Sequence, residues 1–175
     1  TQGVSSAASD VYKRQAPDRM DTEGDGPFDR LVVENVMLVN GLGAPPRGPV
    51  SIVISGDTIA QIVSYPPKPV PGEHRVDARG MTALPGFIDA HVHIANPYEG
   101  VVGPITPPEY VFKLWLAHGI TTVRDTGSVM GLDWTVSHAV RAARNEIVAP
   151  DIVPFAMFPG LSLIHISEPT RRRGI

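Results

Sequence analysis

The chain of 175 residues contains no cysteine. Without thiols it can form neither disulfide bonds nor a thiolate zinc site, so any bound metal must have nitrogen and oxygen ligands. The chain also lacks an excess of either charge, because its formal net charge is −3 at pH 7. This near neutrality argues against nucleic acid or an anionic membrane as the main partner.

Long apolar runs are absent as well. A membrane-spanning helix needs roughly 20 consecutive apolar residues, and no stretch approaches that length, so no membrane anchor is expected. The cytoplasm is the default location. Secretion stays open, because the native amino terminus, where a signal peptide would lie, is expected to be missing.

Both ends of the chain resemble translated sequencing adapters. Residues 5–15 read SSAASDVYKRQ, and residues 161–171 read LSLIHISEPTR. The nucleotide strings that encode them in transposon-based adapters are reverse complements over their shared part. We therefore treat residues 1–15 and 161–175 as adapter-like artefacts and exclude them from fold reasoning. The alternative is that His165 lies on a short strand and supplies a third metal ligand.

The residues between these ends are expected to be a fragment of a longer protein with three parts. Residues 16–30 are charged and rich in Gly and Pro, which indicates a disordered lead-in. Residues 31–82 contain β-branched runs separated by turn residues, and they predict a small all-β domain. Residues 83–160 alternate strands with helices, which indicates βαβ units and a parallel sheet.

Two helices are predicted in this last part. The first should begin at a capping box formed by Thr106 and Glu109 and stop at Gly119. The second should run over about residues 133–147 and leave His138 exposed. Its buried stripe is predicted to consist of Leu132, Val136, Val140, Ala143 and Ile147.

The stretch at residues 81–94 reads MTALPGFIDAHVHI and organises the rest of the chain. Alternation along a strand places Asp89, His91 and His93 on one face and apolar residues on the other. A carboxylate and two histidines on an inward face would cost several kcal/mol of desolvation unless a cation satisfied them. We therefore predict that His91 and His93 bind a metal. The alternative is a pair of histidines on a solvated sheet face.

The position of these histidines distinguishes between two α/β folds. In a (β/α)₈ barrel, functional residues project from the carboxyl ends of the strands, where His91 and His93 lie, as do Thr126 and Gly127. A doubly wound sheet would place a Gly-rich phosphate loop after the first strand, and HVHIANPYEG contains no such motif. The predicted fold is an incomplete TIM-type barrel, with its first three strands and two helices, preceded by the small all-β unit.

A small β-unit followed by LPGFIDAHVHI and HGITTVRDTG resembles the start of the metal-dependent amidohydrolase superfamily, in the branch of imidazolonepropionase-like and prolidase-like proteins. The resemblance covers about residues 31–160. It implies a TIM-type barrel beside a β-sandwich, of which residues 31–82 would be the amino-terminal half. It also implies a hydrolase that cleaves carbon–nitrogen bonds of small molecules: non-standard amides, imides, cyclic amides or Xaa-Pro dipeptides.

The resemblance assigns roles to several residues. It implies that His91 and His93 bind a divalent metal, zinc first, with one or two ions in the full-length protein. It implies that Asp89 supports these ligands without binding the ion. Tyr98 and Glu99, in the loop after the first barrel strand, are weaker candidates for substrate binding.

Other parts of the site would lie beyond Gly160. The resemblance places the remaining ligands and the general base there, so no catalytic residue is expected in this fragment, and the fragment alone should be inactive. The full-length protein is expected to be a homo-oligomer. Two alternatives remain: a non-catalytic barrel with a decayed metal site that serves binding or assembly, and an unrelated βαβ protein without metal.

Overall fold

The computed structural model describes residues 15–95, 106–127 and 130–155. The chain forms two compact units. Residues 21–85 make up one unit, called the β-unit below, and residues 1–20 together with 86–175 make up the other, called the β/α unit. Among the described residues, no helix is both long and apolar enough to cross a membrane.

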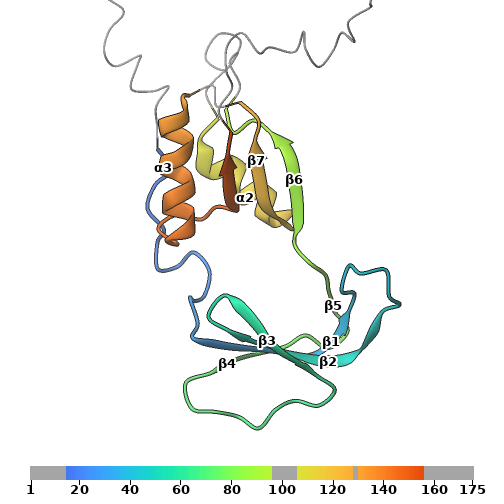
Figure 1. Cartoon of the computed structure of the whole chain (residues 1–175). Coiled ribbons are helices and arrows are strands. Elements are labelled where there is room, and N and C mark those ends of the chain that lie inside the picture. Colours follow the sequence, from blue (N-terminus) through green and yellow to red (C-terminus); the bar gives the residue numbers. More distant parts are fainter. Residues whose placement is uncertain (1–14, 96–105, 128–129, 156–175) are drawn as a thin grey trace, which may run out of the picture. The chain divides into compact units, whose positions relative to one another are not determined.

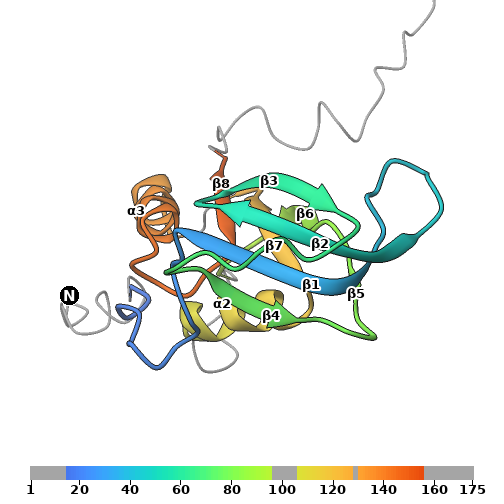
Figure 2. The ribbon, with the colours of Figure 1, turned by 90° about the horizontal axis from the view of Figure 1, so that it is seen from below.

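The β-unit contains a sheet of five short strands in the order β3-β2-β1-β4, with β5 also paired to β1. Strand β2 pairs with β1 and with β3 in antiparallel fashion, whereas β4 and β5 run parallel to β1. Figure 2 shows β1, β2 and β3 side by side. The strands are β1 (Arg30–Leu38), β2 (Arg47–Ser55), β3 (Thr58–Val63), β4 (His74–Asp77) and β5 (Thr82–Ala83).

The strands of the β-unit follow from its β-branched runs and turn residues. Gly56 has a φ of 58° between β2 and β3, a conformation that glycine adopts without strain. A small apolar cluster forms its core: Val36, Leu38, Val50, Ile52 and Ala78. The all-β character predicted for this part of the chain is therefore present.

Ionic contacts add to this small core. Glu73 contacts Arg30 at 3.0 Å and Arg75 at 2.5 Å, and Arg75 also pairs with Glu34. Burial would raise the pKa of Glu73, but the backbone N–H of Val70 and the two arginines outweigh it and lower the pKa to about 2. The carboxylate thus connects β1 to the loop before β4 in its charged form.

The β/α unit contains a parallel sheet in the order β6-β7-β8 and two helices (Figure 1). Its mixed α/β character agrees with the predicted alternation of strands and helices. The elements are β6 (Phe87–Val92), α2 (Pro108–Ala117), β7 (Ile120–Asp125), α3 (Leu132–Ala143) and β8 (Asp151–Pro154).

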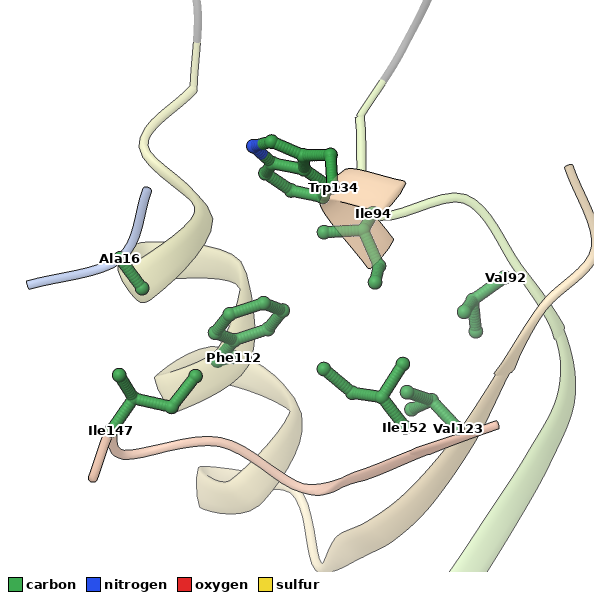
Figure 3. Packing of buried hydrophobic residues seen from close by; sticks show 8 residues of the cluster. All are labelled: Ala16, Val92, Ile94, Phe112, Val123, Trp134, Ile147 and Ile152. Carbon is green, nitrogen blue, oxygen red and sulfur yellow. The ribbon is translucent and has the colours of Figure 1, made fainter. Parts of the chain in front are cut away.

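Phe112 lies at the centre of the apolar core of the β/α unit. Its side chain is 0% exposed and projects from α2 among residues of the sheet and of the loop after α3 (Figure 3). The burial of one aromatic ring and several branched side chains supplies most of the stability of such a layer. The buried cluster consists of Ala16, Val92, Ile94, Phe112, Val123, Trp134, Ile147 and Ile152.

Helix α2 begins one residue later than the capping-box prediction requires. Pro107 is the N-cap and no side chain caps it, so the predicted Thr106–Glu109 capping box is wrong. Pro108, at the first helical position, needs no hydrogen-bond acceptor for its nitrogen. The helix ends as predicted, because Gly119 follows its last turn with a φ of 76°.

The predicted orientation of helix α3 is wrong. Leu132, Val136 and Val140 are 42%, 39% and 42% exposed, and the helix already ends at Ala143. The buried face instead consists of Trp134, Thr135 and His138, with Ala139 and Ala142 partly buried. Burial of the large indole and satisfied hydrogen bonds on this face outweigh the aliphatic stripe on the other.

Residues 16–19, at the start of the lead-in of residues 16–30 that was predicted to be disordered, contact the rest of the β/α unit. Ala16 is 3% exposed within the β/α core, and its N–H donates to Nε2 of His138 at 3.0 Å. The N–H of Arg19 donates to the carbonyl of Glu146 at 2.7 Å. These contacts with residues more than a hundred positions away hold a segment whose composition alone indicates disorder.

Candidate metal centre

His91 and His93 lie close together at the carboxyl end of β6. Their ring centroids are 5.6 Å apart and the rings are nearly perpendicular, with an interplanar angle of 80°. The intervening Val92 and the following Ile94 are 6% and 4% exposed and belong to the opposite, apolar side. The alternation predicted from the sequence is therefore present at this end of the strand.

The spacing of the two rings suits a shared ion. Two imidazoles that bind one tetrahedral zinc ion through Nε2, at about 2.0–2.1 Å, have ring centroids roughly 5 Å apart. The observed centroid distance of 5.6 Å is close to this spacing. The donor set is two neutral nitrogens, which fits zinc or a similar divalent transition metal.

The ring of His93 also has a backbone partner. Its Nδ1 lies 3.3 Å from the carbonyl oxygen of Gly127, at the end of β7. When Nδ1 carries the proton and donates to this carbonyl, Nε2 keeps its lone pair for a metal. Metal-binding histidines typically make such a hydrogen bond with their second nitrogen.

Both histidines are exposed in the described part of the chain. Strand β6 is an edge strand of the described sheet, and its only neighbouring strand there is β7. Within the described ranges, no group of three or more His, Asp or Glu side chains comes close enough to hold an ion.

Asp89 contacts the main chain beside the pair. Its Oδ1 accepts the backbone N–H of His91 at 3.1 Å. The carboxylate thus stabilises the backbone from which His91 projects. Its predicted support of the metal ligands stays a prediction, because this contact orients the peptide and not an imidazole ring.

The two charged residues at the end of β7 have separate partners. The guanidinium of Arg124 lies 4.7 Å from the ring centroid of Phe155. Asp125 is 1% exposed and accepts hydrogen bonds from the hydroxyl of Thr135 at 3.0 Å and from the N–H of Gly127 at 3.4 Å. Each side chain thus has a structural partner of its own, and the two do not pair with each other.

The chain is similar in sequence to known enzymes. No protein-family model matches it. It is 35% identical over 149 residues to adenine deaminase 2 of Rhizobium etli, covering 80% of this chain and 23% of that protein. It is 36% identical over 159 residues to adenine deaminase of Edwardsiella ictaluri, covering 85% and 24%.

Solved structures agree. An Xaa-Pro dipeptidase with bound methionine superposes with a TM-score of 0.60 at 26% identity, covering 73% of this chain and 32% of that one. A putative prolidase from Bifidobacterium longum has the same fold, with a TM-score of 0.60 at 23% identity over 76% of this chain and 31% of that one. The chain belongs to the metal-dependent amidohydrolase superfamily.

The chain spans about a quarter of the length of these curated relatives and about a third of the solved structures. This coverage is what the interpretation as a fragment of a superfamily member expects. The sequence relatives are adenine deaminases, whereas the structural neighbours are named for Xaa-Pro dipeptides, so the comparisons support the superfamily more firmly than a branch within it.

The other described histidines make contacts that stabilise the fold. Nδ1 of His118 lies 2.8 Å from the carbonyl oxygen of Leu114, and the ring stands at the negative end of the dipole of helix α2. The ring of His74 stacks on Phe28 with centroids 4.1 Å apart.

His138 was predicted to be exposed, and that prediction is wrong. Its ring is 0% exposed, lies 4.0 Å from the ring of Trp134, and bonds through Nδ1 to the carbonyl of Trp134 at 2.9 Å. Burial lowers the pKa of His138, followed by smaller effects of neighbouring groups. The second ring nitrogen, Nε2, accepts the N–H of Ala16, a residue 122 positions away that the sequence of the helix does not indicate.

Some predicted site residues cannot be placed. Tyr98 and Glu99, the weak candidates for substrate binding, lie outside the described residues, as does His165. The sequence analysis missed the carbonyl of Gly127 as a partner of His93. The sequence offered one indication of this contact: His93 and Gly127 each follow a predicted strand, and neighbouring parallel strands end at the same edge of a sheet.

Proposed function

We propose that this chain is the start of a hydrolase that cleaves a carbon–nitrogen bond, and that His91 and His93 bind its divalent metal. The proposal rests on one observation: two imidazoles project from the same side of β6 with centroids 5.6 Å apart, at the end of a parallel strand. In barrels of this kind, catalysis takes place at that end of the sheet.

The residues of the chain would hold and orient the ion. His91 and His93 supply two neutral nitrogen ligands, and the Gly127 carbonyl keeps the ring of His93 in a fixed orientation. A bound zinc ion would polarise the substrate and lower the pKa of a water molecule towards ~7. A catalytic zinc usually has three protein ligands, so the remaining ligand and the general base would come from beyond Gly160.

The reaction that we propose first is the removal of an amino group from a purine-like ring. The sequence relatives at 35% and 36% identity are adenine deaminases. In such a reaction the oxygen of water bonds to the ring carbon, the carbon–nitrogen bond breaks, and the nitrogen takes a proton and leaves as ammonia. Hydrolysis of an Xaa-Pro dipeptide is the second candidate, because an Xaa-Pro dipeptidase shares the fold at 26% identity.

Equilibrium dialysis of the 175-residue chain against zinc tests the metal site. We expect weak binding that disappears in the double variant His91→Ala/His93→Ala. His118→Ala is the matched control, because it removes another exposed histidine from the same unit and should leave binding unchanged. Zinc binding that survives the double variant would contradict the proposal.

A test of the substrate requires the longer protein. A protein completed with the rest of the parent gene should release ammonia from adenine in a metal-dependent reaction, and His93→Ala should abolish the release. Turnover of alanyl-proline without turnover of adenine would favour the second candidate. The absence of both activities together with the loss of zinc binding in the completed protein would favour the non-catalytic alternative with a decayed metal site. Metal-dependent turnover by the 175-residue chain alone would refute its predicted inactivity.

A further inference from the structure

Asp125 is a buried carboxylate for which the proposed function has no use. It lies at the last position of β7, is 1% exposed, and accepts a hydrogen bond from the hydroxyl of Thr135 at 3.0 Å. Both of its described hydrogen-bond donors, Thr135 and Gly127, are neutral. Burial of a carboxylate without a cationic partner is costly, so stability alone is a poor reason for its presence.

The second bond of Asp125 leads towards the metal centre. Its Oδ1 accepts the N–H of Gly127 at 3.4 Å, and the carbonyl of the same Gly127 lies 3.3 Å from Nδ1 of His93. A carboxylate held by α3 thus fixes one side of Gly127 while the other side faces a metal-binding ring. His93 directly follows β6, Asp125 is the last residue of β7, and Gly127 lies in the turn after β7.

A second contact keeps the same turn against β6. The N–H of Thr126 donates to the carbonyl of Val92 at 2.9 Å, and its hydroxyl lies 3.3 Å from the same oxygen. Because Val92 immediately precedes His93, the turn that carries Gly127 is fixed beside the histidine backbone. The remaining freedom of Gly127 is the tilt of its peptide groups, which the bond to Asp125 restricts.

We propose that Asp125 is a positioning residue for the metal centre: held by Thr135, it orients Gly127 so that its carbonyl selects the Nδ1–H tautomer of His93 and leaves Nε2 free for the ion. The inference rests on the proposed function for its use of the ion. Its structural part, the tautomer of His93, stands without any metal.

The test is nitrogen-15 NMR of histidine-labelled 175-residue chain, at about pH 8 where an ordinary imidazole is neutral. In the unmodified chain His93 should show the Nδ1–H tautomer as its main form. Asp125→Ala should shift His93 towards the mixture of tautomers seen for a free imidazole, and should weaken zinc binding about 10- to 100-fold, as loss of an outer hydrogen bond typically does.

Two further variants separate positioning from general stabilisation. Thr135→Val removes the bond that holds the other oxygen of this carboxylate but keeps the acceptor for Gly127, so the His93 tautomer should shift in the same direction as in Asp125→Ala, but less. Asp125→Asn keeps one acceptor oxygen for Gly127 and should restore the tautomer and the zinc affinity of the unmodified chain. A role in stability alone would lower the unfolding midpoint in all variants and leave the tautomer as it is.

The outcomes are decisive even if Asp125→Ala does not fold. An Nε2–H tautomer of His93 in the unmodified chain overturns the proposal directly. A folded Asp125→Ala variant with unchanged tautomer and zinc affinity overturns it as well. If the tautomer follows Asp125 as expected but zinc binds elsewhere, the positioning inference stands and the proposed metal site fails.

Discussion

The two units each contain a buried carboxylate, and the two carboxylates have different surroundings. In the β-unit, Glu73 lies between Arg30 and Arg75. In the β/α unit, Asp125 contacts only neutral donors among its described partners, Thr135 and Gly127. A carboxylate with cationic partners stabilises its own surroundings, whereas one with neutral partners at the end of a barrel strand is better explained by the site that it orients.

The units also differ in what holds them together. The β-unit has a small aliphatic core, and ion pairs connect its strands and loops. The β/α unit depends on a larger core around Phe112 and on contacts between residues far apart in sequence, such as Ala16 and His138. We therefore expect the two units to respond differently to loss of core volume and to acid.

Phe112→Ala should have the largest effect. Removal of a fully buried phenylalanine costs about 3–5 kcal/mol, which is a large part of the stability of a small domain. Both tryptophans of the chain, Trp115 and Trp134, lie in the β/α unit, so their fluorescence in urea reports on this unit alone. Ile52→Ala, in the core of the β-unit, is the control and should leave the tryptophan transition unchanged. An equal shift in both variants would show that the units unfold together.

Mild acid should destabilise the β/α unit first. Burial holds the pKa of His138 below its ordinary value of 6.5, so protons bind the unfolded chain more readily. Its stabilising effect is complete above about pH 6.5 and is lost as the pH falls from there through the folded pKa. The urea midpoint of tryptophan fluorescence should therefore fall between pH 7 and pH 5. His138→Gln should remove most of this dependence, and an unchanged slope in that variant would contradict the explanation.

Stronger acid should be needed to affect the β-unit. The pKa of Glu73 is lowered to about 2 from an ordinary value of 4.5, so its stabilising effect is present above about pH 4.5 and is lost as the pH falls towards 2. Glu73→Gln should lower the protection of β1 and β4 amides from hydrogen exchange at neutral pH. Asp57→Asn, in an exposed turn, is the matched control. Equal protection in the two variants would count against the ionic contacts.

The smallest effect is expected for Val140→Ala on the exposed side of α3. Val140 is 42% exposed, and substitutions at such surface positions usually change stability by no more than about 0.5 kcal/mol. The sequence pattern placed Val140 in the buried stripe, which would make the same substitution clearly destabilising. A loss of well over 1 kcal/mol in urea unfolding would therefore favour the orientation predicted from the sequence.

The strands could be predicted from the sequence because their signal is local. Alternation from His91 to Ile94 identified both the apolar side at the end of β6 and the two histidines on the other side. The orientation of helix α3 could not be predicted, because the face with Trp134 and the face with Val136 and Val140 are nearly equal in apolar content. Contacts with Ala16 and with Phe112 decide between them, and neither leaves a trace in the sequence of the helix.

In the candidate site, too, the residues with a local sequence pattern could be predicted and their distant partners could not. His91 and His93 stood out because two imidazoles two residues apart in a strand share a face. The hydrogen-bond partner of His93 could not be predicted, because it is the backbone carbonyl of Gly127, and any residue type has such a carbonyl. The role of Asp125 depends on a turn whose course only the folded chain determines.

The central claim is that His91 and His93 bind one ion together. Its most direct test is a zinc titration of the histidine-labelled chain followed by nitrogen-15 NMR, with all six histidines observed at once. We predict that the imidazole signals of His91 and His93 change together at the same zinc concentration while those of His118 and His138 stay in place. Unchanged signals of His91 and His93 at saturating zinc would contradict the account.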